Sequence, residues 1–259
     1  MHFLKLPQVK KGGGMNISSV MKSTFFILFL LSSSFTFADD SSKGLEIAIQ
    51  ADKTSEGFVD SQASMQMQLT TRKGNVVTRN MKSKRLEVKG DGDKSLIIFE
   101  SPRDVKGVAI LSFSHKTSAD DQWLYLPALK RVKRISSDNR SGAFVGSEFA
   151  YEDLASQEVE KYTYKWIEDV PCPGDEAEKC YVSESYPEEK SSGYTRRVSW
   201  VDINEHRVRK IDFYDRKNKL LKTLVFSSTD RREVLAGSDY VIFMMQVGGY
   251  KPSTVIDFE

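Results

Sequence analysis

The sequence predicts a mainly β-sheet protein with few helices, built on a large antiparallel sheet that is curved or closed into a barrel. One observation is the alternation that starts at residue 60, where Ala63, Met65 and Met67 are separated by polar residues. This pattern is typical of a strand with one buried face. A second observation is that such stretches follow one another at short spacing, with turn residues between them.

Turns at Gly74 and Gly92 separate the first three strands, and about eleven strands are expected in all. A sheet of this size leaves a concave face that side chains, a helix or a ligand must fill. Further strands are expected at residues 76–88, 96–99, 108–113, 123–126, 131–135, 158–167, 180–186, 194–203, 208–215, 220–227 and 240–247.

Helical periodicity is found near the start of the domain. Leu45 and Ile49 recur at helical spacing, so residues 41–56 are expected to form a helix that Gly57 ends. Residues 39–259 contain no internal repeat, no low-complexity tract and no linker. A single domain is therefore expected over this range.

The N-terminus has the pattern of a secretory signal peptide. Lys22 supplies a positive charge, residues 25–31 an apolar core, and Ala38 a small residue for cleavage. This apolar core is well short of the ~20 residues that a membrane-spanning helix needs. We therefore expect export with cleavage after Ala38, which removes residues 1–38; the alternative is a retained membrane anchor. Residues 1–20 fit poorly in front of a signal, so a start at Met15 or Met21 is favoured.

The predicted export also bears on charge and on modification. Removing residues 1–38 takes away four of the 38 basic residues and none of the 36 acidic ones, which leaves a formal charge of −2. A nearly neutral protein is a poor candidate for binding nucleic acid. No cysteine lies near the cleavage site, so the processed protein is expected to be soluble and without an N-terminal lipid.

The two cysteines, Cys172 and Cys180, flank a turn-rich stretch at residues 173–176. A short hairpin separation in an oxidising compartment favours a disulfide over two free thiols. The spacing excludes a CxxC redox motif, and no histidine or third cysteine lies nearby to complete a metal site. Neither a metal nor a cofactor is expected.

Residues 123–154 form the most informative stretch. An aromatic strand is followed by a basic segment, a Ser/Asn/Gly loop, and aromatic residues around residues 146–148. Such a Gly-flanked loop predicts a movable cover, residues 142–154, over an apolar cavity. Taken singly, each apolar candidate is more often ordinary core than a ligand contact. The candidates for the cavity or its gate are Met65, Met67, Phe99, Phe113, Trp123, Tyr125, Phe144, Phe149, Tyr151 and Trp200.

The same stretch, DQWLYLPALKRVKRI and then GSEFAYEDL, with SPRDVKG upstream, resembles the outer-membrane lipoprotein-sorting proteins of Gram-negative bacteria. These are relatives of the periplasmic lipoprotein carrier of the Lol pathway. The resemblance covers residues 44–250 and implies an incomplete β-barrel, with helices and a loop across its mouth, that binds acyl chains. Arg131 and Arg134 lie within the motif and are candidates for holding the loop or a lipid headgroup. Lys130 and Lys133 are expected on a solvated face.

The function predicted from these observations is a periplasmic carrier or chaperone, without a covalent step, for a lipid or for the acyl chain of a lipoprotein in outer-membrane biogenesis. The alternative is an accessory protein that docks on an RND-type inner-membrane export system or on an outer-membrane acceptor. An enzyme is not expected, because His115 and His206 are the histidines available after processing and no catalytic motif accompanies them. The enzymatic alternative is a hydrolase of envelope lipids, with one of these histidines as its base. Glu148, Glu152 and Asp153 are expected to solvate a short helix in the cover and to interact with its basic neighbours.

Overall fold

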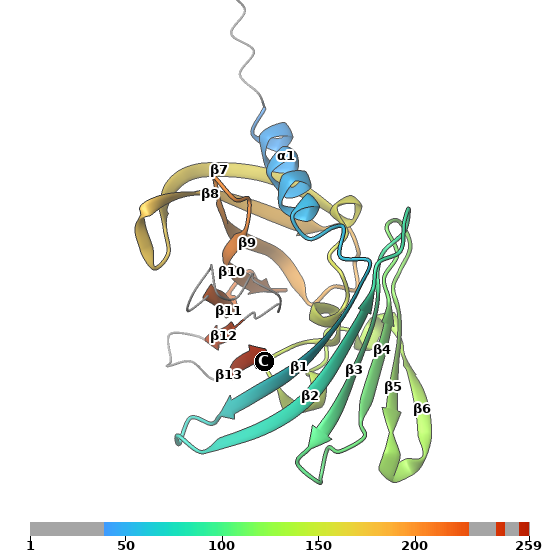
Figure 1. Ribbon diagram of the computed structural model, residues 1–259. Coiled ribbons are helices and arrows are strands. Elements are labelled where there is room, and N and C mark those ends of the chain that lie inside the picture. The colour runs from blue at the N-terminus through green and yellow to red at the C-terminus, as the bar shows by residue number, and fades with distance from the viewer. Residues whose placement is uncertain (1–38, 228–241, 247–253, 259) are drawn as a thin grey trace, which may run out of the picture. The chain divides into compact units, whose positions relative to one another are not determined.

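The computed structural model describes residues 39–227, 242–246 and 254–258 (Figure 1). The predicted signal peptide lies outside these residues. The described residues belong to one compact unit. They confirm the predicted fold class, a mainly β protein with a curved antiparallel sheet that forms an incomplete barrel. The strands are β1 (Asp60–Thr70), β2 (Val76–Leu86), β3 (Lys94–Ser101), β4 (Ala109–Phe113), β5 (Asp121–Leu126), β6 (Arg131–Ile135), β7 (Tyr162–Cys172), β8 (Asp175–Pro187), β9 (Tyr194–Asp202), β10 (Val208–Asp215), β11 (Leu220–Ser227), β12 (Ile242–Gln246) and β13 (Thr254–Phe258).

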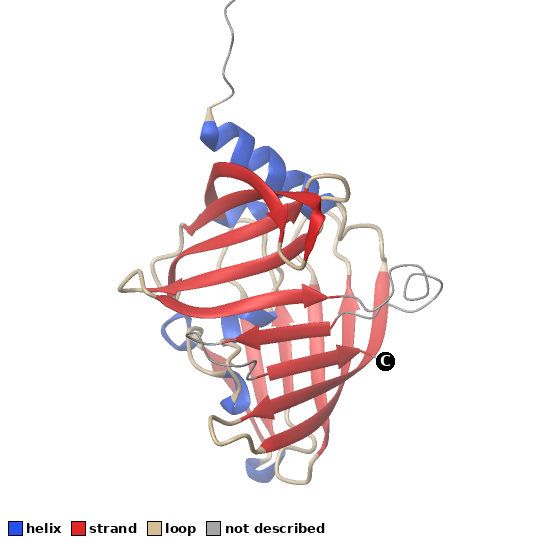
Figure 2. Ribbon diagram, turned by 90° about the vertical axis from the view of Figure 1, so that its left-hand side faces the viewer, coloured by secondary structure: helices blue, strands red, loops and turns tan. Residues whose placement is uncertain are grey.

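The strands lie side by side in a curved layer (Figure 2). Hydrogen bonds join them in the order β6-β5-β4-β3-β2-β1-β13-β12-β11-β10-β9-β8-β7. Neighbours in this order also follow one another along the chain, except where β13 pairs with β1, with Met67 opposite Ile256. That pairing joins two meanders, β1–β6 and β7–β13, which curve towards each other (Figure 1). The described strands leave β6 and β7 as free edges, so the barrel stays open.

The helix α1 (Asp40–Lys53) lies against β7 and β8 (Figure 1). It ends three residues before the predicted boundary of 41–56, because the backbone N–H groups of Thr54 and Ser55 close the last turn on the carbonyls of Ala51 and Asp52. Gly44 allows the helix to approach the sheet closely: a Cβ there would lie 2.7 Å from the backbone nitrogen of Trp166. The chain then turns with a positive φ of 86° at Gly57.

The core lies on the concave face between the two meanders. Inward-facing Met67, Met81 and Phe99 pack in one cluster with Phe213 and Leu224 from the other meander. Burial of each such side chain contributes roughly 1.5–3 kcal/mol. The 3-10 turns η3 (Phe144–Gly146) and η4 (Tyr151–Leu154) insert between the meanders and complete this cluster. Three further 3-10 turns are η1 (Pro127–Leu129), η2 (Ser137–Asn139) and η5 (Val159–Lys161).

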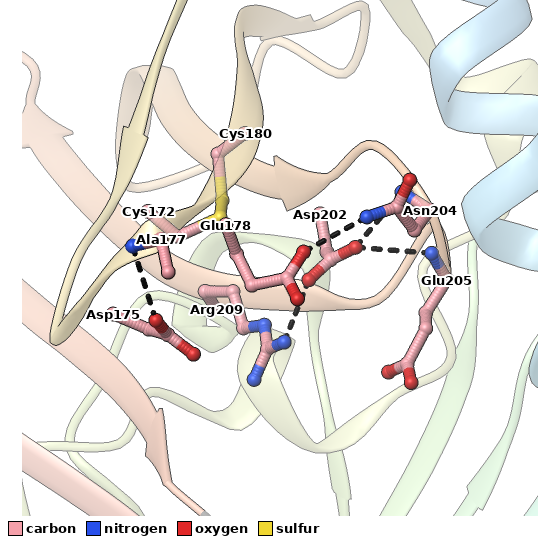
Figure 3. The surroundings of a disulfide bond; sticks show 9 residues. All are labelled: Cys172, Asp175, Ala177, Glu178, Cys180, Asp202, Asn204, Glu205 and Arg209. Carbon is pink, nitrogen blue, oxygen red and sulfur yellow. Dashed lines mark hydrogen bonds and ion pairs between the residues drawn. A yellow bond between two sulfur atoms is a disulfide. The ribbon is translucent and has the colours of Figure 1, made fainter.

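The β7–β8 hairpin contains the predicted disulfide, in which Cys172 and Cys180 are joined with an S–S distance of 2.03 Å (Figure 3). Beside it, Asp202 at the end of β9 accepts the backbone N–H groups of Asn204 and Glu205 and a hydrogen bond of 2.6 Å from Arg209. The Asn204 amide also donates to Glu178 in the hairpin, at 2.8 Å. These bonds tie the hairpin to the β9–β10 turn.

Candidate functional site

A cavity of about 520 Å³ lies between α1 and the concave face of the sheet. Its walls come from α1, the end of β2 with the β2–β3 turn, the segment 156–159, and strands β7 to β10. A volume between roughly 300 and 1,000 Å³ is typical of small-molecule sites. The fold therefore holds a ligand-sized space beneath its single described α-helix.

The cavity wall is part apolar and part polar. Ile47 on α1 faces Val208 and Ile211 on β10, and these residues supply apolar surface. Ser183 and Ser199, which are paired across β8 and β9, supply hydroxyl groups to the same wall. Such a lining suits an amphiphile, because apolar and polar parts of one ligand can each find matching surface.

Charged side chains gather where α1, the β2–β3 turn and the segment 156–159 meet. Burial, and then the negative charges of Asp52 and Asp93, raise the pKa of Glu158 to about 7. Burial and nearby carboxylates also raise the pKa of Asp52. Asp91 behaves in the opposite way, since its hydrogen bond with His115, of 2.8 Å, lowers the pKa of its carboxyl to about 2.

His115 contacts carboxylates on both sides of its ring. Its Nδ1 bonds Asp91, and its Nε2 lies 3.5 Å from Asp121. The hydrogen bond with Asp91 raises the pKa of the imidazole. This arrangement ties the β2–β3 turn to β5. Among the described residues, the ring nitrogens of His115 contact two carboxylates and no nucleophilic side chain.

The cover segment, residues 142–154, is held in the concave face by buried charge. Lys222 on β11, 2% exposed, donates to the carbonyl of Glu148 at 3.0 Å and forms an ion pair with Asp153. Tyr194 donates to the same carboxylate at 2.8 Å. On the other meander, Arg79 of β2 donates to the carbonyl of Val145 at 2.6 Å. Side chains from both meanders thus form hydrogen bonds or ion pairs with the cover segment and hold it in place.

Glu152 is the second buried carboxylate of the cover segment, 4% exposed. It accepts hydrogen bonds of 2.8 Å from the hydroxyl of Ser192 and from the backbone N–H of Gly193. The predicted interaction with a basic residue is present between Asp153 and Lys222, but the expectation that Glu152 and Asp153 are solvated is wrong. The reason is that the β8–β9 loop and Lys222 supply enough donors to bury both groups.

Six of the predicted ligand contacts come together, but in the packed core and not on the cavity wall. Met65 and Met67 are 8% and 2% exposed, and Phe149 is 7% exposed. Phe99 and Phe144 stack with ring centroids 5.6 Å apart, and Tyr151 packs edge-on against Phe144. These side chains fill the end of the concave face that the cover segment occupies. Their part in ligand binding stays a prediction.

Four other predicted contacts lie on the outer face of the sheet, which corrects their placement. Phe113, Trp123 and Tyr125 alternate with buried residues of β4 and β5, and the first two pack edge to face at 5.2 Å. Trp200 alternates with the cavity residues Ser199 and Val201 and lies under Lys210 Nζ at 4.0 Å. Both faces of these strands carry apolar residues, so alternation alone could not choose the inner one.

The two arginines of the basic segment lie on the free edge of the sheet. Arg134 pairs with Asp121 of β5, and Arg131 is exposed on β6. Arg134 therefore joins two neighbouring strands and does not contact the cover segment. The predicted loop-holding role falls instead to Arg79 and Lys222. The sequence signal for both is a charged residue at an inward, otherwise apolar position of an alternating strand.

Known proteins with a similar sequence and fold identify the family. A family model described only as an uncharacterized protein matches residues 91–245. A crystal structure described as an outer membrane lipoprotein-sorting protein domain, from Vibrio parahaemolyticus, is 48% identical, has a TM-score of 0.78, and is matched over 85% of this chain and 91% of that chain. The chain belongs to this lipoprotein-sorting family. No curated protein matches the chain at a significant level.

Two further structures extend the comparison for this family member. A DUF1329 family protein from Desulfovibrio piger is 29% identical, with a TM-score of 0.76 over 85% of this chain and 92% of that chain. A LolA superfamily protein from Nitrosomonas europaea is 20% identical, with a TM-score of 0.62 over 83% and 91%, and shows the shared fold. This member of the family therefore shares its overall fold with that LolA superfamily protein.

Within the described ranges, no helix combines the length and the apolar character needed to cross a bilayer. In the same part of the chain, no group of three or more His, Cys, Asp or Glu side chains is placed to hold a metal ion.

Proposed function

We propose that this protein is a periplasmic carrier that binds a lipid, or the acyl chain of a lipoprotein, and transfers it across the cell envelope. The observation that carries the proposal is the cavity beneath α1, in a member of a lipoprotein-sorting family. Burial of an acyl chain contributes about 0.8 kcal/mol per methylene, so ten methylenes in the cavity contribute about 8 kcal/mol. Binding and release need no covalent chemistry.

The element that opens in this proposal is α1. The cover segment was the predicted gate, but moving it would separate the buried pair of Lys222 and Asp153. A charge left buried without its partner typically costs about 3–5 kcal/mol, and Lys222 would be left so if the segment carried Asp153 away while Lys222 stayed buried. By contrast, Lys43 of α1 makes a partly exposed ion pair of 3.5 Å with Asp169 on β7, and exposed pairs contribute at most about 1 kcal/mol. Among the described residues, displacing α1 therefore breaks an exposed ion pair and no buried one, together with the packing of Ile47 and Gly44 against the sheet.

A cavity-filling substitution tests the proposal. Ala48 lines the cavity from α1, whereas Leu45 on the same helix is 41% exposed. We expect Ala48→Trp to weaken binding of the neutral fluorophore N-phenyl-1-naphthylamine at least tenfold, and Leu45→Trp to leave it unchanged. Fluorescence titration of the processed protein measures both. Equal binding by wild type and Ala48→Trp would show that the cavity is not the binding site.

A second candidate function is docking on a partner in the envelope, such as an RND-type export system or an outer-membrane acceptor. The observation in its favour is the apolar outer face of β3 to β6. There Tyr125 is 38% exposed and Val132 is 64% exposed, next to the Phe113–Trp123 pair. Exposed aromatic residues of this kind are enriched at protein interfaces. Trp123→Ala should abolish such docking without changing fluorophore binding, which a crosslinking assay on envelope membranes can check.

A further inference from the structure

Glu158 is a buried acid that faces the cavity. It lies just before η5, is 7% exposed, and lines the cavity wall. Within the described part of the chain, its carboxylate has no hydrogen bond or ion pair. Its Oε1 atom lies 2.7 Å from the position that a Cβ would take at Gly92, so a glycine there leaves room for it. A buried carboxylate is costly unless a cation or donors pair with it.

The charged groups around Glu158 leave it without a partner. Asp52 on α1 and Asp93 in the β2–β3 turn are the nearest anions, and the pKa of Glu158 is raised partly through them. Two cations are also close, but each lies near another acid. Lys161 is paired with Asp120, and Lys116 is 3.8 Å from Glu160.

The chemistry of the cavity wall indicates which ligand would supply the missing partner. The lining carries six acidic residues and three basic ones, and one of the three, Arg85, is paired with Asp93 at 3.1 Å. An anionic headgroup would meet repulsion here. A metal ion would need several oxygen ligands in a fixed arrangement, and the described residues provide no such group. An ammonium group supplies one positive charge and three N–H donors.

We propose that the cavity binds an amphiphile with a primary ammonium headgroup, with Glu158 as its counter-ion. The apolar chain would lie along Val201, Val208 and Ile211, which line the same cavity. This inference rests on the proposed function and names the class of cargo. A primary ammonium fits better than a quaternary one, because the carboxylate of Glu158 accepts hydrogen bonds and a quaternary ammonium has no N–H group to donate.

The test compares two probes that differ in one group. Isothermal titration of the processed protein with dodecylamine and with dodecanol, below any micelle-forming concentration, keeps the chain constant and changes the head. At pH 8 we expect wild type to bind the amine about 10 to 100 times more tightly, the range for a charge-assisted hydrogen bond. Glu158→Gln should abolish this preference, and Glu56→Gln should keep it. Glu56 also lines the cavity but is exposed.

The outcomes separate this inference from the carrier proposal. Equal affinity of wild type for the two probes, or an amine preference that survives in Glu158→Gln, would overturn the inference and leave the carrier proposal standing. No binding of either probe would overturn both. Lysophosphatidylethanolamine in place of dodecylamine distinguishes the source of the group. Its binding would point to a phospholipid, and its rejection beside tight amine binding would point to a simpler alkylamine.

Discussion

Replacing Lys222 with methionine leaves the Asp153 carboxylate buried without its ion-pair partner. Methionine has a similar length and is well tolerated in cores, so the effect reports lost charge more than lost volume. Removing one partner of a buried pair typically destabilises a protein by 3–5 kcal/mol. Asp153 keeps its bonds of 2.6 Å to the Ala150 N–H and 2.8 Å to the Tyr194 hydroxyl. We therefore expect a loss of about 3 kcal/mol, the lower end of that range.

Urea unfolding at pH 7.5, followed by tryptophan fluorescence, measures this loss. With a slope of about 2–3 kcal/mol per molar urea, the midpoint should fall by about 1–1.5 M. The matched control is Lys82→Met, because Lys82 pairs with Glu100 at 2.7 Å with the two side chains 57% and 45% exposed. An exposed pair contributes at most about 1 kcal/mol. If both variants lost the same small amount, the cover segment would not be held by buried charge.

Four further changes have defined outcomes. Gly44→Ala forces α1 away from the β7 backbone and should destabilise by about 1–3 kcal/mol, so an unchanged melting temperature would contradict the close helix contact. Replacing Cys172 and Cys180 by alanine opens a loop with a sequence separation of 8; we expect a loss of about 2.5 kcal/mol in urea, which a reducing agent should reproduce in wild type only. Glu158 has a folded pKa of about 7, above its unfolded value, so its stabilising contribution is present below about pH 4.5 and is lost as pH rises through 7. Glu158→Gln should therefore match wild type at pH 4 and exceed it by up to about 3 kcal/mol at pH 8, and identical pH profiles in urea melts would refute the shift. Phe149→Glu places a charge in the core and should unfold the protein, so a native circular dichroism spectrum would contradict its core position.

The sequence was sufficient to predict most of the sheet, because most strand pairs are local hairpins. Ala63 to Leu69 alternate as predicted, and the turn at Gly74 joins β1 to β2. The last strand, β13, was not predicted. It is five residues long and pairs with β1 from the other end of the chain, so no local pattern identifies it.

The candidate site was harder to predict, for two physical reasons. Trp123 and Phe113 lie on strands with apolar residues on both faces, and alternation cannot say which face is inside. The cavity wall contains Glu158 and Ser199, which resemble ordinary surface residues in the sequence. The motif that carries the family resemblance, GSEFAYEDL, instead builds the buried cover segment. Its Phe149 fills the core and its Asp153 pairs with Lys222.

Organic extraction and lipid mass spectrometry of the processed protein, purified from cell envelopes, test the central proposal most directly. We expect close to one acyl-chain lipid or lipoprotein per protein chain in wild type and in Leu45→Trp, and little in Ala48→Trp, whose new side chain occupies the cavity. Wild-type protein that carries no lipid, and that also fails to take up N-phenyl-1-naphthylamine, would contradict the carrier proposal.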